Sequence, residues 1–162
     1  MDFMPKQVDV LVVDDDEAAF LLVRQMLTQS AGEIDFRPEW VSNTDKAIEL
    51  MKSNLHQVVL MDYMLGEHTG LDVIRNASQQ GAQGPFILLT GKGSYQVDLE
   101  AMEADVAAYL NKEGLTAAEL ERTIRYSLAH KQREAIRLDM AKKRALANGS
   151  EKGQRDDLGD IL

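Results

Sequence analysis

The sequence predicts an α/β fold: a doubly wound sheet of five parallel strands with helices on both faces. Two observations lead to this prediction. Short apolar runs alternate along the chain with amphipathic stretches, which is typical of β-α units and a parallel sheet. The runs are also apolar at nearly every position, as expected for strands buried on both faces. They span residues 8–13, 58–61, 86–89 and 107–110.

One more strand is expected at residues 36–41, second in chain order. Pro38 lies within it, and because proline cannot donate a hydrogen bond to a neighbouring strand, we expect this strand at an edge of the sheet. The amphipathic stretches predict five helices. They cover residues 18–30, 44–54, 70–80 and 95–104, and a long stretch that starts at residue 116.

The last of these helices has the clearest start. Thr116 and Glu119 have the spacing of a capping box, in which each side chain accepts a hydrogen bond from a free backbone amide of the first turn. Leu120, Ile124 and Leu128 then form one apolar stripe. We expect this stripe to pack on the sheet.

Beyond residue 130 the apolar pattern thins among many charges, so the helix is expected to run past the globular part. We predict a domain over residues 1–130, a helical extension over 131–147 and a disordered polar tail over 148–162. The extension has two interpretations: a solvated stub, or a helix that dimerises or carries a signal. Lys131 stands where a coiled coil needs an apolar residue, which favours the stub.

Composition limits the class of function. A chain of 162 residues with 44% hydrophobic content can form one well-buried domain plus an appendage. Its net charge of −9 argues against a nucleic-acid interface, which needs a basic face. No apolar run reaches the roughly 20 residues of a membrane span, and the first residues lack the apolar core of a secretion signal. The chain has no cysteine, which excludes disulfides, and we expect a cytoplasmic setting.

Acidic residues follow two of the apolar runs. Asp14 and Asp15 come directly after the first run, and Asp62 follows the run at 58–61. Because parallel strands end at the same edge of a sheet, we expect these carboxylates to face one another there. Neighbouring carboxylates repel one another, and a divalent cation with oxygen ligands, here magnesium, would relieve that repulsion. The alternative is that an acidic triplet only caps the next helix, a role that fits Asp16.

Thr90 and Lys112 follow two further runs and supply a hydroxyl and a compact cation, which are groups that hold the oxygens of a phosphoryl group. Gly91 lets the backbone approach a ligand and offers an amide donor. No histidine or cysteine is placed for catalysis, so a carboxylate must take the transferred group, and Asp62 is the best placed. The sequence therefore predicts an aspartyl phosphate at Asp62.

These residues resemble the receiver domain of two-component response regulators. The likeness covers about residues 8–130, and the stretch 120–128 is similar to receivers that precede a PAS, diguanylate cyclase or kinase module. No such module is expected in the remaining residues. The likeness rests on Val-Val-Asp14-Asp15, Leu-Met-Asp62-Tyr-Met64-Leu-Gly66 running to Gly70, Leu-Leu-Thr90-Gly91 and Tyr109-Leu-Asn-Lys112, in the order typical of that family.

The resemblance implies a flavodoxin-like sheet with strand order 2-1-3-4-5, and a signalling domain rather than a turnover enzyme. Asp62 would accept a phosphoryl group from a histidine kinase or a phosphotransfer protein. The face formed by the fourth helix, fifth strand and fifth helix would read out the change, and either this face or the extended helix could form a homodimer. Asp14, Asp15, Asp62 and the backbone carbonyl of Met64 would bind magnesium, Thr90 and Lys112 would hold the phosphate, and Tyr109 would be an aromatic switch that swings inward when Thr90 moves.

Some details differ from the family pattern or stay open. Gly66 stands where the family usually has proline, which implies a looser loop. Glu113 stands where the family usually has a proline joined by a cis bond. Because a cis bond before another residue costs about 2.5–4 kcal/mol, we expect a trans bond after Lys112 and a rerouted entry to the last helix. Tyr109 has a second interpretation, in which it only packs at a strand end with its hydroxyl at the surface.

Two other functions are compatible with parts of the pattern. In a phosphatase of the haloacid dehalogenase type, Asp14 would be the nucleophile, but such an enzyme needs a further acidic pair after the lysine-bearing strand, and only Glu113 is near. A receiver-shaped adaptor would signal by binding alone. The complete set of acidic, hydroxyl and lysine groups argues against the adaptor.

Overall fold

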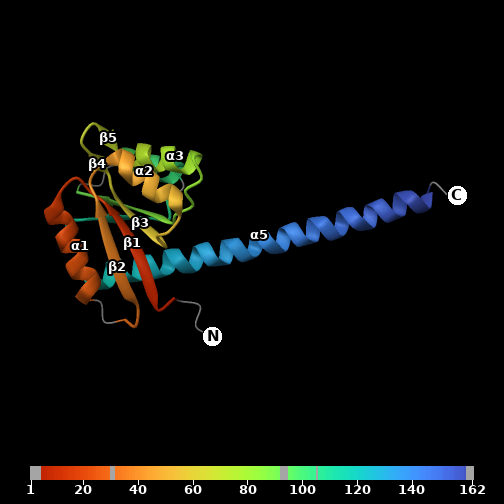
Figure 1. Ribbon diagram of the computed structural model, residues 1–162, viewed down its shortest axis with the longest axis horizontal. Helices are drawn as coiled ribbons and strands as arrows, with labels where there is room; N and C mark the ends of the chain where they lie inside the picture. Colours follow the sequence, from red (N-terminus) through yellow and green to blue (C-terminus); the bar gives the residue numbers. More distant parts are fainter. Residues whose placement is uncertain (1–4, 30–31, 92–94, 105, 160–162) are drawn as a thin grey trace. The chain divides into compact units, whose positions relative to one another are not determined.

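The computed structural model describes residues 5–29, 32–91, 95–104 and 106–159. The chain divides into two compact units, Met1–Leu128 and Ala129–Leu162. The first unit contains the sheet, and the second is the distal part of the last helix (Figure 1).

Five parallel strands form the main sheet, in the order β2-β1-β3-β6-β7. Counted along the chain, this is the expected order 2-1-3-4-5, because β4 and β5 belong to a separate hairpin. Pro38 pairs with Val10 on the edge strand β2, as predicted. The strands are β1 (Gln7–Val13), β2 (Asp35–Val41), β3 (Val58–Asp62), β6 (Phe86–Thr90) and β7 (Ala108–Asn111).

Helices cover both faces of the sheet because alternate residues of each strand point to opposite sides. Residues such as Leu11 and Met61 face a core that contains side chains of α2 (Thr44–Ser53), α3 (Gly70–Gln79) and α4 (Tyr95–Glu103). Val12 and Leu60 face the opposite core, with α1 (Glu17–Gln29) and the first turns of α5 (Ala117–Gly159). The doubly wound arrangement follows from these two cores (Figure 1).

The loop after Asp62 contains a small hairpin that the sequence did not predict. Met64 pairs with Thr69, and Leu65 pairs with His68, in antiparallel strands β4 (Met64–Leu65) and β5 (His68–Thr69). Gly66 lies at the turn with φ +62°, a conformation that glycine adopts without strain. The Thr69 hydroxyl accepts a hydrogen bond from the Asp72 amide at 3.2 Å and so caps α3.

Helix α5 begins as expected and ends later. The Thr116 hydroxyl accepts a hydrogen bond from the Glu119 amide at 3.1 Å, and both Leu120 and Ile124 are fully buried. The helix continues to Gly159, although we expected a disordered tail from residue 148. This segment includes the helix-forming residues Glu151, Lys152, Gln154 and Arg155, and each of its glycines costs only about 1 kcal/mol relative to alanine.

The peptide bond before Glu113 is trans, as expected. Gly84–Pro85 is the one cis peptide bond in the described part of the chain, so the bond between Lys112 and Glu113 is trans. The turn that follows has Gly114 at φ +78° and a hydrogen bond from the Leu115 amide to the Lys112 carbonyl at 3.3 Å. Nowhere in the described residues is there a helix long and apolar enough to cross a membrane.

Candidate functional site

Three carboxylates meet at the carboxyl-terminal edge of the sheet. Asp14 and Asp15 follow β1, and Asp62 is the last residue of β3. Each contributes a carboxylate oxygen to a group in which these atoms lie within 4.8 Å of one another. Asp14 and Asp62 are buried, and Asp15 is exposed. The structure thus brings together the residues that the sequence placed on neighbouring strand ends.

Asp14 is held firmly in this position. Its side chain accepts a hydrogen bond from the Asp16 amide at 2.9 Å, and its backbone carbonyl accepts one from the indole of Trp40 at 2.8 Å. Asp16 is exposed and turns toward α1, where its side chain accepts from the Ala18 amide at 3.0 Å. Asp16 therefore caps the helix, and Asp14 and Asp15 face the cluster.

Lys112 lies between the two buried carboxylates. Its ammonium nitrogen is 2.9 Å from Asp14 Oδ2 and 3.0 Å from Asp62 Oδ1. The Lys112 amide also donates to the Thr90 carbonyl at 2.8 Å, which ties the end of β7 to the end of β6. Burial lowers the pKa of Lys112, but the hydrogen bonds and charges of Asp14 and Asp62 outweigh burial and raise it overall. The lysine therefore stays cationic in the site.

Asp62 is buried beside two other carboxylates and one ammonium. Burial raises the pKa of Asp62, Asp14 and Asp15 raise it further, and Lys112 opposes them without cancelling the rise. Three carboxylates around one ammonium leave an excess of negative charge at this edge. Such an oxygen-rich, anionic cluster has the donor set that suits a hard divalent cation.

Thr90 and Gly91 complete this edge. Thr90 ends β6, pairs in register with Asn111 and is 2% exposed. Gly91 is exposed, and an added Cβ there would meet nothing within 4 Å, so the backbone is open to a ligand. The next two residues of this loop, Lys92 and Gly93, lie outside the described residues.

The chain immediately after Asp62 is pinned on both sides, a feature that the sequence did not reveal. The Tyr63 amide donates to the Leu89 carbonyl at 2.8 Å, and the Tyr63 carbonyl accepts from the Gly70 amide at 2.7 Å. A Cβ on Gly70 would lie 2.2 Å from the backbone oxygen of Asp62. Glycine is therefore needed here for the close approach of α3 to Asp62. Met64, predicted as a carbonyl ligand, lies in β4 and is 62% exposed as a residue.

Tyr109 packs with its hydroxyl turned inward. It lies on β7 against the core beneath α4, and its hydroxyl is buried without a hydrogen-bond partner. The alternative in which the hydroxyl reaches the surface does not describe this structure. Tyr63 packs against the same core, and its hydroxyl donates to Glu100 of α4 at 3.2 Å. Burial and then Glu100 raise the pKa of Tyr63.

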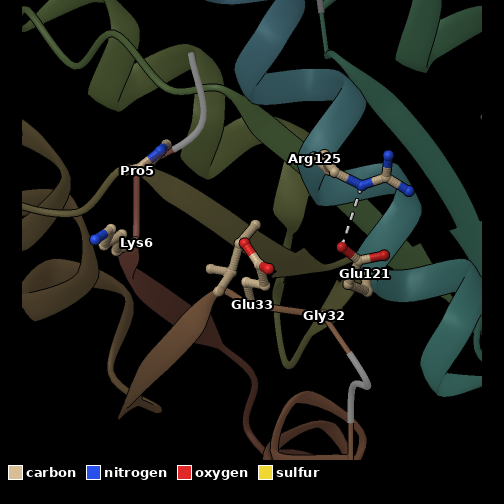
Figure 2. Close-up of a pocket in the computed structure, with 7 residues that line it drawn as sticks. Pro5, Lys6, Gly32, Glu33, Glu121 and Arg125 are labelled. Atoms are coloured by element: carbon tan, nitrogen blue, oxygen red, sulfur yellow. Dashed lines mark hydrogen bonds and ion pairs between the residues drawn. The ribbon is translucent and has the colours of Figure 1, made fainter. Parts of the chain in front are cut away.

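A separate hollow of about 340 Å³ lies at the opposite end of β1, around Lys6 (Figure 2). In it Arg125 and Glu121 of α5 form an ion pair of 3.1 Å. The hollow combines charges of both signs. It lies near the start of β1 and shares no residue with the carboxylate cluster. It is lined by Pro5, Lys6, Gly32, Glu33, Ile34, Glu121 and Arg125.

A family model described as the response regulator receiver domain matches residues 10–125. Among curated proteins, the response regulator MprA of Mycobacterium sp. (strain KMS) is 30% identical over 105 residues, which is 65% of this chain and 44% of that protein. The two-component response regulator PhoP of Pseudomonas aeruginosa is 30% identical over 102 residues, 63% of this chain and 44% of that protein. The chain thus spans less than half the length of these curated relatives.

Solved structures show the same fold. The signal receiver domain of a putative Luxo repressor protein from Vibrio parahaemolyticus aligns with a TM-score of 0.70 and 20% identity, over 80% of this chain and 96% of that one. A CheY-like receiver domain protein from Methanospirillum hungatei JF-1 aligns with a TM-score of 0.68 and 20% identity, over 79% of this chain and 98% of that one.

Proposed function

Because this chain belongs to the response regulator receiver domain family, we propose that it is a phosphoacceptor in a two-component phosphorelay and that Asp62 receives the phosphoryl group. The observation that carries this proposal is the position of Asp62. Its buried carboxylate lies 3.0 Å from the Lys112 ammonium and faces Asp14 and Asp15. This is the only group of three or more potential metal-binding side chains that the described residues form.

In the proposed reaction, an Asp62 oxygen attacks phosphorus and forms the O–P bond of an aspartyl phosphate. The bond from phosphorus to the donor breaks in the same transfer, and the donor group leaves with the electron pair. With a histidine kinase or a phosphotransfer protein as donor, the broken bond is P–N, and the donor ring, protonated on its other nitrogen, leaves as neutral histidine. The Lys112 ammonium, already beside Asp62, then balances the charge of the phosphoryl oxygens.

We assign the cation site to the carboxylates of Asp14, Asp15 and Asp62 with the backbone carbonyl of Met64, and we expect Mg²⁺ there. The observation that supports this assignment is the excess of negative charge that raises the pKa of Asp62. When bound, Mg²⁺ would offset this charge and orient the phosphoryl oxygens. Lys112, Thr90 and the Gly91 amide would hold those oxygens from the other side.

Phosphorylation at this edge of the sheet would change a partner-binding face nearby. Thr90 leads directly into the loop before α4, and Tyr109 lies on β7 beneath α4 with its hydroxyl already inward. A phosphoryl group that draws Thr90 inward would therefore stabilise this Tyr109-in state. The face of α4, β7 and α5 would then bind a partner or a second copy of the chain. The only reactions of the domain would be its own phosphorylation and dephosphorylation. A kinase donor and the lack of cysteine are consistent with a cytoplasmic location.

The test is incubation with acetyl phosphate and Mg²⁺, followed by intact mass. The unchanged chain should gain one phosphate, and Asp62→Asn should gain none. Asp16→Asn is the matched control, because it removes a nearby acidic group that caps α1 and should be phosphorylated normally. Asn also caps helices well.

Two outcomes would overturn the proposal in favour of the other functions. Continuous release of phosphate that survives Asp62→Asn but is lost in Asp14→Asn would indicate the phosphatase. Neither a covalent phosphate nor phosphate release would indicate the adaptor.

A further inference from the structure

Tyr63 connects the phosphoacceptor to helix α4. Its backbone follows Asp62 directly and is fixed to β6 through Leu89 and to the start of α3 through Gly70, at 2.8 and 2.7 Å. Its side chain points a different way and donates a hydrogen bond to Oε2 of Glu100 at 3.2 Å. A single residue therefore links the backbone beside the reacting carboxylate to a helix that begins beyond the phosphate-binding loop.

Among the side chains of α4 that the structure describes, few are buried, so packing gives this hydrogen bond little support. Ala101 is buried, but Leu99 is 41% exposed and Met102 is 80% exposed. A hollow of about 240 Å³ is lined by residues of both α4 and β7, and Tyr109 is one of them. The buried hydroxyl of Tyr109 lacks a hydrogen-bond partner. An unpaired buried hydroxyl is unfavourable, so a movement of α4 that gave the Tyr109 hydroxyl a partner would remove this cost.

Asp62 itself does not need the Tyr63 side chain to stay in place. Its carboxylate is held by Lys112, and the backbone that follows is held by Leu89 and Gly70. The Tyr63 hydroxyl instead contacts α4, through Glu100. Loss of the phenol hydroxyl should therefore leave the carboxylate cluster intact and release the helix.

We propose that the hydrogen bond between Tyr63 and Glu100 holds α4 in its unphosphorylated position and thereby restrains phosphorylation of Asp62. The inference rests on the proposed function, and it makes Tyr63 and Glu100 positioning residues. The proposal requires this contact to weaken when Asp62 is phosphorylated, and a contact of that kind biases the equilibrium toward the unphosphorylated state. Because such coupling is reciprocal, release of α4 makes phosphorylation easier, and phosphorylation loosens α4.

The experiment measures the rate of Asp62 phosphorylation by acetyl phosphate and Mg²⁺, together with hydrogen exchange of the α4 amides. In Tyr63→Phe, which keeps the ring and removes the donor, the rate should rise about threefold to tenfold, the factor expected for one hydrogen bond. Amide exchange across α4 in the unphosphorylated chain should become faster. Glu100→Ala should show both changes.

Two further variants separate the hydrogen bond from a general effect on the helix. Glu100→Gln keeps an acceptor oxygen and should stay close to the unchanged chain. Glu103→Ala removes an exposed acidic group from the end of the same helix and should phosphorylate at the normal rate. Because the proposed effect of Tyr63 runs through Glu100, Tyr63→Phe should have little further effect in a chain that already carries Glu100→Ala.

The inference is overturned if, in Tyr63→Phe, the α4 amides exchange faster but Asp62 is phosphorylated at the normal rate. The contact would then be purely structural. It is also overturned if phosphorylation becomes slower, or if neither quantity changes. Failure of the proposed function would look different, because the unchanged chain itself would then gain no phosphate.

Discussion

The side chain of Asp62 is 9% exposed and lies beside two other carboxylates. Burial, Asp14 and Asp15 together raise the pKa of Asp62 above the ordinary value of 3.8. A carboxyl group with a higher pKa in the folded chain than in the unfolded chain binds its proton more tightly when folded. Its contribution to stability is therefore fully present below pH 3.8 and is lost as the pH rises through the folded pKa.

The raised pKa of Asp62 leads to a prediction for the chain without divalent cations. Asp62→Asn keeps the volume and removes the unfavourable charge, so at pH 7 it should raise the melting temperature by about 2–4 °C, the shift expected from roughly 1 kcal/mol. The gain should shrink as the pH is lowered toward the ordinary carboxyl pKa, where Asp62 is protonated. Thermal melts in a chelator at several pH values measure this.

Asp16→Asn again serves as the control, because Asp16 is exposed and outside the cluster. Its melting temperature should differ little from that of the unchanged chain at any of these pH values. A lower melting temperature for Asp62→Asn at pH 7 would show that the attraction to Lys112 outweighs burial and repulsion.

The sequence was enough to predict some of the contacts at this site but not others, and the reason is geometric. Asp14, Asp62, Thr90 and Lys112 each follow a recognisable strand, and parallel strands end at one edge, so their meeting could be inferred. The contact between Tyr63 and Glu100 spans 37 residues and depends on where α4 lies, which no local pattern encodes. The inward hydroxyl of Tyr109 was also undetermined, because both orientations suit a strand end.

At the scale of elements, the approach of α3 to β3 depends on Gly70. An added Cβ would lie 2.2 Å from the Asp62 carbonyl oxygen and 2.7 Å from Cγ of Met61. The first of these is a backbone atom that cannot turn aside, so Gly70→Ala must displace the helix or the loop. We expect a loss of about 2 kcal/mol or more in the free energy of unfolding, measured by urea denaturation.

Gly91→Ala is the matched control for this change. An added Cβ at Gly91 meets nothing within 4 Å, and its φ is not in the left-handed region. The free energy of unfolding should therefore change by less than about 1 kcal/mol. Equal losses in the two variants would contradict the steric explanation.

The predicted elements agree with the observed ones to within one or two residues wherever an element packs on the sheet, as for β3 and α2. Where an element is buried, its apolar residues recur at the spacing of a helix or a strand, and this spacing is visible in the sequence. The hairpin of β4 and β5 was missed because two-residue strands are too short to show alternation. The end of α5 was missed because no core imposes a pattern beyond Leu128.

At the scale of the whole molecule, charge is distributed unevenly. The whole chain carries −9, yet residues 129–147 contain six basic and two acidic residues. Two copies of this segment side by side would repel each other, and salt would weaken that repulsion. A homodimer through α5 should therefore strengthen with ionic strength. The basic residues are Lys131, Arg133, Arg137, Lys142, Lys143 and Arg144, and the acidic ones are Glu134 and Asp139.

The last prediction concerns the independence of the first unit. Every buried residue of the two hydrophobic cores belongs to the unit that ends at Leu128, and the apolar residues of the distal helix, such as Ile136 and Leu146, are exposed. A chain without residues 135–162 keeps more than one helical turn after Leu128, which protects the packed part of α5 from fraying. It should unfold cooperatively, with a free energy of unfolding within about 1 kcal/mol of the full chain.

Urea denaturation tests this, and phosphorylation of Asp62 by acetyl phosphate should proceed at the same rate in both chains. Light scattering over a range of salt concentrations then shows whether the removed segment holds two copies together, since only the full chain should change mass with salt. Loss of a cooperative transition in the shortened chain would mean that the distal helix stabilises the sheet. Because the cores are complete without that helix, the structure favours the opposite result.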